Sequence, residues 1–194
     1  PSVGSFSILI SMYFLIKKAI NFKYKNILIL QDDIILDKNF INKFNKTISN
    51  LPNWYLLYLG ANDKYIKYSL NKKSFQSIYY YCCGKTDGAF AIIINYQIFN
   101  DILNEISKIL MPFDSGALIF IQKKYYNKSL VIYPNLIIAD VTSSECRKKR
   151  DQVKFSNKVL WNLNNFNFET DNIIQNINKT IIICDFNKLN LQTI

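Results

Sequence analysis

Two kinds of apolar segment alternate along the chain and predict helices and buried strands in turn. Apolar positions at helical spacing cover residues 5–20, 38–49, 96–109 and 115–124. Short apolar runs, typical of strands buried on both faces, cover residues 26–30, 54–59, 78–83, 89–94, 129–133 and 136–139. This alternation predicts an α/β fold with a mixed, mainly parallel sheet flanked by helices.

Changes in composition suggest where the domain ends. Residues 61–77 are polar and Lys-rich, which predicts a surface loop, and the chain becomes Asn-rich from about residue 155. We therefore expect a catalytic domain over residues 1–155 and a C-terminal extension, or the start of a further region, over 156–194. An apolar run at 180–184 predicts a late strand.

The N-terminal run of residues 2–16 is uncharged and mostly apolar. It is shorter than a membrane span requires, and it lacks the positive start of a signal peptide. A buried helix is the better interpretation, and we expect no transmembrane segment. The sequence starts at Pro1, which predicts that the domain is N-terminally incomplete.

The charged and reactive side chains restrict the possible chemistry. The chain has no His, so proton transfer must fall to a carboxylate, Tyr, Lys or Cys, and a metal would be a hard cation with oxygen ligands. The net charge is +10, but the basic residues are almost all Lys, with Arg only at Arg147 and Arg150. Arg is the residue that typically clamps phosphates, so a nucleic-acid-binding domain is a minor alternative. The four Cys match no zinc pattern and predict free thiols.

An acidic pair marks the candidate site. Asp32 and Asp33 directly follow the apolar run at 26–30, and ligands of α/β sheets bind at the carboxyl ends of strands. Adjacent carboxylates repel each other unless a cation compensates. A divalent metal that bridges a diphosphate would do so. A turn cap beside a solvated carboxylate is the structural alternative.

Several segments in chain order resemble one enzyme family. The motifs are Gly-Ser-Phe at 4–6, Ile-Leu-Gln-Asp-Asp at 29–33, Trp-Tyr-Leu-Leu-Tyr-Leu-Gly at 54–60, Thr-Asp-Gly-Ala-Phe at 86–90, Pro-Phe-Asp at 112–114, Tyr-Pro-Asn-Leu-Ile at 133–137 and Ser-Glu at 144–145. Together they resemble glycosyltransferase family 25, which includes lipopolysaccharide galactosyltransferases and collagen galactosyltransferases. The resemblance covers about residues 3–150.

The resemblance implies a fold, a donor and a metal. It implies a GT-A-like fold whose first strand and helix lie upstream of Pro1, dependence on Mn²⁺ (or Mg²⁺), a UDP-sugar donor and inversion at the anomeric carbon. The chain departs from the family pattern at three positions. Gln31 stands in place of a Glu, Leu9 in place of a His, and Glu145 in place of an Asp.

Roles for individual residues follow from the resemblance and from their chemistry. Asp33 is the expected metal ligand, and Asp32 is expected at the metal or the donor. The other candidates have one role each: Gln31 and Glu145 as metal ligands, Asp140 as an alternative third ligand, Asp87 and Arg147 as donor contacts, and Asp114 as the general base. Asp114 could instead cap the helix at 115–124, and Asp37 is expected to cap the helix at 38–49.

The leading hypothesis is an enzyme that transfers a hexose from a UDP-sugar to a glycan or protein hydroxyl, as in lipopolysaccharide biosynthesis. The alternative is a non-catalytic relative that only binds glycans or proteins, and Gln31 motivates it. The Lys, Asn and Ile bias suggests the AT-rich genome of a bacterium or large virus, and free thiols favour a reducing compartment. We therefore expect a cytoplasmic protein of a bacterium or of a virus-infected cell.

Overall fold

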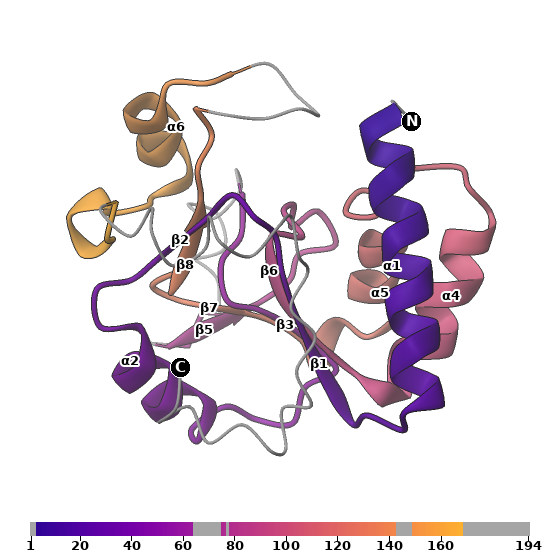
Figure 1. Cartoon of the computed structure of the whole chain (residues 1–194). Coiled ribbons are helices and arrows are strands. Elements are labelled where there is room, and N and C mark those ends of the chain that lie inside the picture. Colours follow the sequence, from indigo (N-terminus) through magenta and orange to yellow (C-terminus); the bar gives the residue numbers. More distant parts are fainter. Residues whose placement is uncertain (1–2, 64–74, 77, 143–148, 169–194) are drawn as a thin grey trace.

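The computed structural model describes residues 3–63, 75–76, 78–142 and 149–168, which form one mixed α/β arrangement (Figure 1). The main sheet has six strands, which lie in the order β1 (Asn26–Leu30), β6 (Ala91–Asn95), β3 (Leu56–Tyr58), β7 (Ser129–Ile132), β5 (Tyr79–Tyr81) and β4 (Phe75–Gln76). A second sheet pairs β2 (Ile34–Leu36) with β8 (Ile137–Ala139), antiparallel.

The α/β class is confirmed, but the expectation of a mainly parallel sheet is wrong. Among the described strands only β3 and β7 pair in parallel, and every other pair is antiparallel. Strands β1 and β3 run in the same direction, but β6 lies between them and runs the opposite way. A parallel pair needs its two strands side by side, so this insertion removes the β1–β3 pair.

Helices cover both faces of the main sheet (Figure 1). One face carries α1 (Val3–Asn21), α4 (Phe99–Ser107) and α5 (Ala117–Lys124). The other side carries the small sheet together with α2 (Phe40–Ile48) and α6 (Gln152–Val159). Short 3₁₀ turns complete the set: η1 (Tyr96–Ile98), η2 (Tyr126–Lys128) and η3 (Leu163–Asn165). Each layer has its own apolar core, so the sheet is buried on both faces, as its continuous apolar strands predict.

Helix α1 buries one side of its surface. Leu9, Met12, Ile16 and Ala19 are fully buried against the sheet and α4. By length and composition alone α1 is also a helix that could cross a membrane. The buried side agrees with the expectation of a packed helix, whereas the opposite side is open to solvent.

Strand β8 lies within the strand predicted at 136–139, whereas its partner β2 and helix α6 were not anticipated. Strand β2 has only three residues and follows the acidic pair, so the apolar run of 34–36 reads as part of a turn. Helix α6 begins at Asp151, whose side chain accepts a hydrogen bond from Lys154 N at 2.8 Å. Phe155, Trp161 and Phe166 are buried in the same core as β2 and β8. The division at 155/156 stays a prediction, and the run at 180–184 lies outside the described residues.

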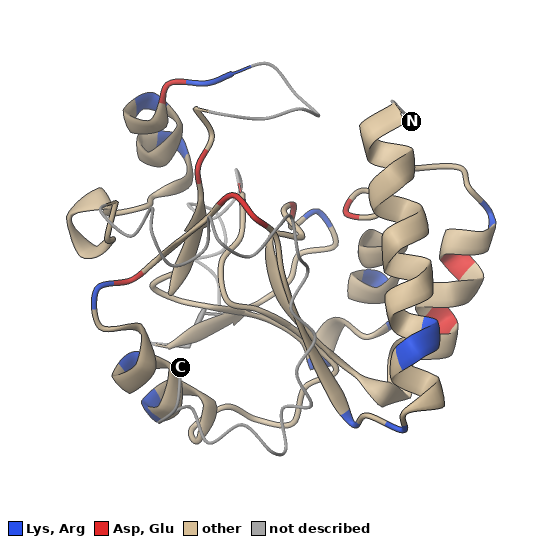
Figure 2. Cartoon of the chain, in the orientation of Figure 1, with Lys and Arg blue, Asp and Glu red and all other residues tan. Residues whose placement is uncertain are grey.

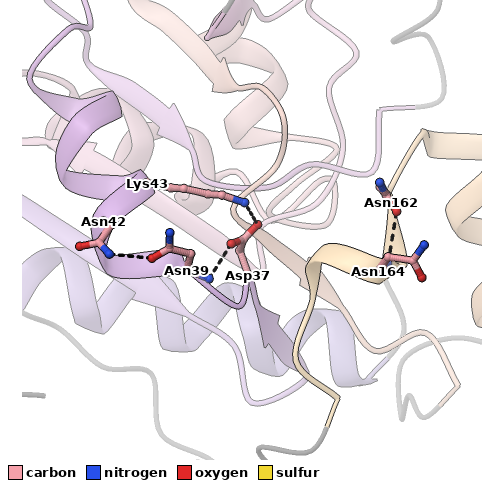
Figure 3. Close-up of polar contacts among 6 residues, drawn as sticks. All are labelled: Asp37, Asn39, Asn42, Lys43, Asn162 and Asn164. Atoms are coloured by element: carbon pink, nitrogen blue, oxygen red, sulfur yellow. Dashed lines mark hydrogen bonds and ion pairs between the residues drawn. The ribbon is translucent and has the colours of Figure 1, made fainter.

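Asp37 does not cap α2. The helix begins at Phe40, and its N-cap residue Asn39 makes no side-chain cap bond. Instead, the buried Asp37 carboxylate accepts hydrogen bonds from Asn39 N at 2.8 Å and Lys43 Nζ at 2.6 Å (Figure 3). A bridge between Asp37 and Phe166 brings the η3 segment alongside. Asp37 therefore ties the turn before α2 to the end of the described chain.

Candidate functional site

The ends of three strands place a group of acidic residues at one edge of the main sheet. Gln31 to Asp33 directly follow β1, and Gln31 N donates to Phe90 O at 2.9 Å. Asp140 follows β8, and its backbone N donates to Asp33 O at 2.6 Å. These hydrogen bonds hold the acidic pair between the start of β6 and the end of β8.

Two more segments reach the same edge. Because β6 runs antiparallel to β1 and β3, the segment before β6 lies beside the ends of those strands. Asn62 N donates to Asp87 O at 2.8 Å, which joins the segment after β3 to the segment before β6. We call this region the acidic edge (Figure 2), and it comprises Asp32, Asp33, Asp63, Asp87, Asp114 and Asp140.

Two glycines allow the segments of the acidic edge to approach one another. A Cβ on Gly60 would lie 1.7 Å from the carbonyl oxygen of Ile137, so any other residue would force β3 and β8 apart. Gly88 has φ +99° and would place a Cβ 2.8 Å from Cε1 of Phe90. Only glycine adopts this backbone conformation without strain.

A buried polar network lies beneath the acidic edge. The side chain of Gln122, on α5, is fully buried. Its Oε1 accepts from Thr86 N at 3.1 Å, and its Nε2 donates to Thr86 O at 2.8 Å and to the Tyr58 hydroxyl at 2.8 Å. Thr86 Oγ1 then contacts Asp63 Oδ2 at 3.4 Å. Gln122 thus fixes the backbone next to Asp87 from both sides.

Burial keeps the nearby hydroxyl and thiol groups neutral. Burial raises the pKa of the Tyr58 hydroxyl well above its usual value; the charges of Asp114 and Asp87 raise it further, and the hydrogen bond from Gln122 opposes the shift. Burial and then Asp63 raise the pKa of Tyr80, and burial raises the pKa of the Cys82 thiol. These groups cannot serve as bases or thiolate nucleophiles near neutral pH. Among the described residues, the carboxylates of the acidic edge remain candidates for accepting a proton there.

Two buried amide oxygens near the acidic edge lack partners in the described part of the chain. These are Oδ1 of Asn62 and Oδ1 of Asn135, whose side chains are only 9% and 8% exposed. They flank Ala61, whose carbonyl oxygen accepts from Asn135 Nδ2 at 3.3 Å and from Trp161 Nε1 at 3.1 Å. A buried acceptor without a donor is costly. An enclosed water molecule would satisfy each one.

Asp114 has a different local role from the one expected of a helix cap. Helix α5 begins at Ala117 with Gly116 as its N-cap, so the prediction that Asp114 caps this helix is wrong. The Asp114 carboxylate is half-buried, and its Oδ1 accepts from Ser115 N at 2.8 Å. The charges of Asp114 and Asp87 both raise the pKa of Tyr58. Asp114 therefore belongs to the acidic edge rather than to the helix terminus.

The predicted metal ligands are only partly assembled. Asp32 is exposed, and Gln31 and Asp33 are half-buried after β1. Asp140 Oδ1 accepts from Thr142 N at 2.8 Å and from Thr142 Oγ1 at 2.6 Å, so this oxygen is already engaged. Among the described residues no three His, Cys, Asp or Glu side chains could together hold a metal ion. Glu145 and Arg147 lie outside the described residues.

Sequence reasoning missed the amide and carboxylate residues that follow β3 and β7. Asn62 and Asp63 come soon after the strand predicted at 54–59, and Asn135 soon after the strand predicted at 129–133. The strand-end rule that selected Asp33 would have selected them too. Gln122 carries no comparable signal, because its partner Thr86 is 36 residues away.

No protein-family model matches the chain, and neither the curated proteins nor the solved structures give a match.

Proposed function

We propose that the protein is a metal-dependent glycosyltransferase that moves a hexose from a UDP-sugar to a glycan or protein hydroxyl, with inversion at the anomeric carbon. One observation carries the proposal: carboxylates from five separate segments gather at the edge where β1 and β3 end. Open α/β sheets bind ligands at this edge. The resemblance to glycosyltransferase family 25 supplies the reaction.

The oxygen ligands suit a hard cation bound together with its substrate. Asp33 and Asp32 would hold Mn²⁺ with Gln31, because carboxylate and amide oxygens are the donors such ions prefer. Ions of this kind take one or two carboxylates and complete their shell with substrate phosphates. When bound, the metal supplies positive charge to the donor diphosphate.

The remaining residues receive roles by elimination and position. Asp114 would accept the proton of the acceptor hydroxyl, since the neighbouring Tyr58 and Cys82 side chains stay protonated. Asp87 would contact the donor.

Binding of UDP to the full-length protein, measured by calorimetry with and without Mn²⁺, tests the proposal. We expect binding that requires Mn²⁺, and a loss of at least about tenfold in affinity in Asp33→Asn, since a charge-assisted contact contributes about 1.5–3 kcal/mol. Asp101→Asn is the matched control, because Asp101 lies on α4 and pairs with Lys124 away from the acidic edge. UDP binding that is the same with and without Mn²⁺ and in Asp33→Asn, or the absence of binding, would favour the non-catalytic alternative.

A further inference from the structure

Large apolar side chains are exposed on the outer side of α1 and on the segment that follows α4. Six of them form what we call the docking surface: Phe6, Ile10, Phe14, Ile109, Leu110 and Met111. Phe14 is 65% exposed and Leu110 is 73% exposed. Exposed large apolar side chains that gather on one part of a domain typically mark an interaction site.

The helical members of the docking surface share one side of α1. Phe6, Ile10 and Phe14 are spaced four residues apart, so they form a stripe along the helix. This stripe faces away from the buried side of α1, which packs on the sheet and on α4. Each of the three side chains leaves at least a third of its surface exposed to solvent.

The segment after α4 extends the docking surface. Helices α1 and α4 pack against each other, and the connection from α4 to α5 lies at the same end of this helical layer as the N-terminus of α1 (Figure 1). Ile109 follows Lys108, the C-cap residue of α4, and has φ +52°. Glycine is the usual residue in this left-handed position, and a β-branched residue is strained there. The strain at Ile109 would be offset if its exposed side chain contacts another molecule.

Positive charge borders the docking surface. The first acidic residue of the sequence is Asp32, whereas four Lys precede it: Lys17, Lys18, Lys23 and Lys25. Lys17 and Lys18 lie one turn beyond Phe14 on α1 and are exposed. The two acidic residues of α4 are already paired, Glu105 with Lys108 and Asp101 with Lys124. Lysines thus lie beside the stripe on α1, and α1 itself carries no acidic residue (Figure 2).

We propose that the docking surface binds the surface of an anionic lipid membrane. Apolar side chains that enter the boundary of the acyl chains, next to Lys side chains that reach lipid phosphates, are the features of an interfacial helix. A second copy of the chain is a poorer occupant, because a two-fold contact brings the same surface to itself and offers no acidic residue to the lysines. The inference concerns attachment and goes beyond the sugar transfer proposed above.

Sedimentation of the full chain with vesicles tests the inference without any nucleotide sugar. We expect the protein to bind vesicles of phosphatidylcholine mixed with phosphatidylglycerol, to bind phosphatidylcholine alone far less, and to dissociate as salt is raised. Ile109→Gly should lower the partition coefficient roughly tenfold, since it removes a large apolar side chain. The same change should leave the melting temperature unchanged or raised, because it relieves the left-handed strain.

Two further variants complete the experiment. Phe14→Ser should weaken vesicle binding to a similar extent, whereas Tyr96→Ser, which changes an exposed aromatic residue on η1, should not. Binding that is absent, or that is equal on both vesicle types, would overturn the proposal, as would binding that Ile109→Gly and Phe14→Ser leave unchanged. A concentration-dependent dimer that Phe14→Ser dissociates would assign the surface to a second copy instead.

Discussion

Replacing Gln122 by Met should destabilise the protein and loosen the segment that carries Asp87. Met has a similar length and flexibility and fills the same space on α5, so the change removes hydrogen bonds with little change in volume. Three buried groups lose their partner: Thr86 N, Thr86 O and the Tyr58 hydroxyl.

The size of the effect follows from the burial of these groups. Gln122, Thr86 and Tyr58 are each fully buried, so water cannot replace the lost bonds without entering the core. An orphaned buried polar group costs about 1–3 kcal/mol. With three such groups, and with some local rearrangement, we expect the free energy of unfolding to fall by about 3–5 kcal/mol.

Urea unfolding of wild type, Gln122→Met and Gln97→Met measures this difference. Gln97 is exposed on η1, so the control should change stability by less than about 0.5 kcal/mol. The amide hydrogen of Thr86 should also exchange with solvent much faster in Gln122→Met. A loss below about 1 kcal/mol with unchanged exchange at Thr86 would refute the role of Gln122.

Two other changes test separate parts of the structure. Gly60→Ala should lower the free energy of unfolding by about 3 kcal/mol or more, because the new Cβ meets the Ile137 carbonyl; a thermal melt within a few degrees of wild type would contradict the close approach. Hydrogen bonds from Lys124 and then Tyr125 lower the pKa of Asp101. The ionised Asp101 therefore stabilises the fold above its pKa in the unfolded chain, about 3.9. This stabilisation is lost as the pH falls through the lower pKa of the folded protein. Urea unfolding should be measured from pH 7 to pH 2. The free energy of unfolding of wild type should exceed that of Asp101→Asn at pH 7, and this difference should shrink below about pH 4. A difference that stays constant with pH would contradict the reasoning.

Local patterns predicted the elements better than their arrangement. The apolar runs of β1 and β7 and the helical spacing of α4 are visible because burial dictates them residue by residue. Which strand lies beside which is decided by contacts between distant segments. The insertion of β6 between β1 and β3 leaves no mark on any of the three sequences, so the predicted parallel sheet was wrong.

The residues of the candidate site also differ in how far local sequence pattern could predict them. Asp33 could be selected because a carboxylate at a strand end follows from local pattern alone, whereas Asp87 was selected through the family resemblance. The caps predicted at Asp37 and Asp114 failed, since both helices begin two or more residues later and the carboxylates bind other groups. Gln122 could not be selected, because no neighbouring residue in the sequence indicates that α5 buries this amide side chain.

Turnover of a UDP-sugar by the full-length protein tests the proposed function most directly. The release of UDP should be measured across common UDP-hexoses with Mn²⁺ and with a chelator, for wild type, Asp33→Asn, Asp114→Asn and the control Asp101→Asn. We predict Mn²⁺-dependent release that falls at least about a hundredfold in Asp33→Asn and Asp114→Asn and that persists in Asp101→Asn. Release that is absent for every donor, or that survives both substitutions at the acidic edge, would contradict the proposal.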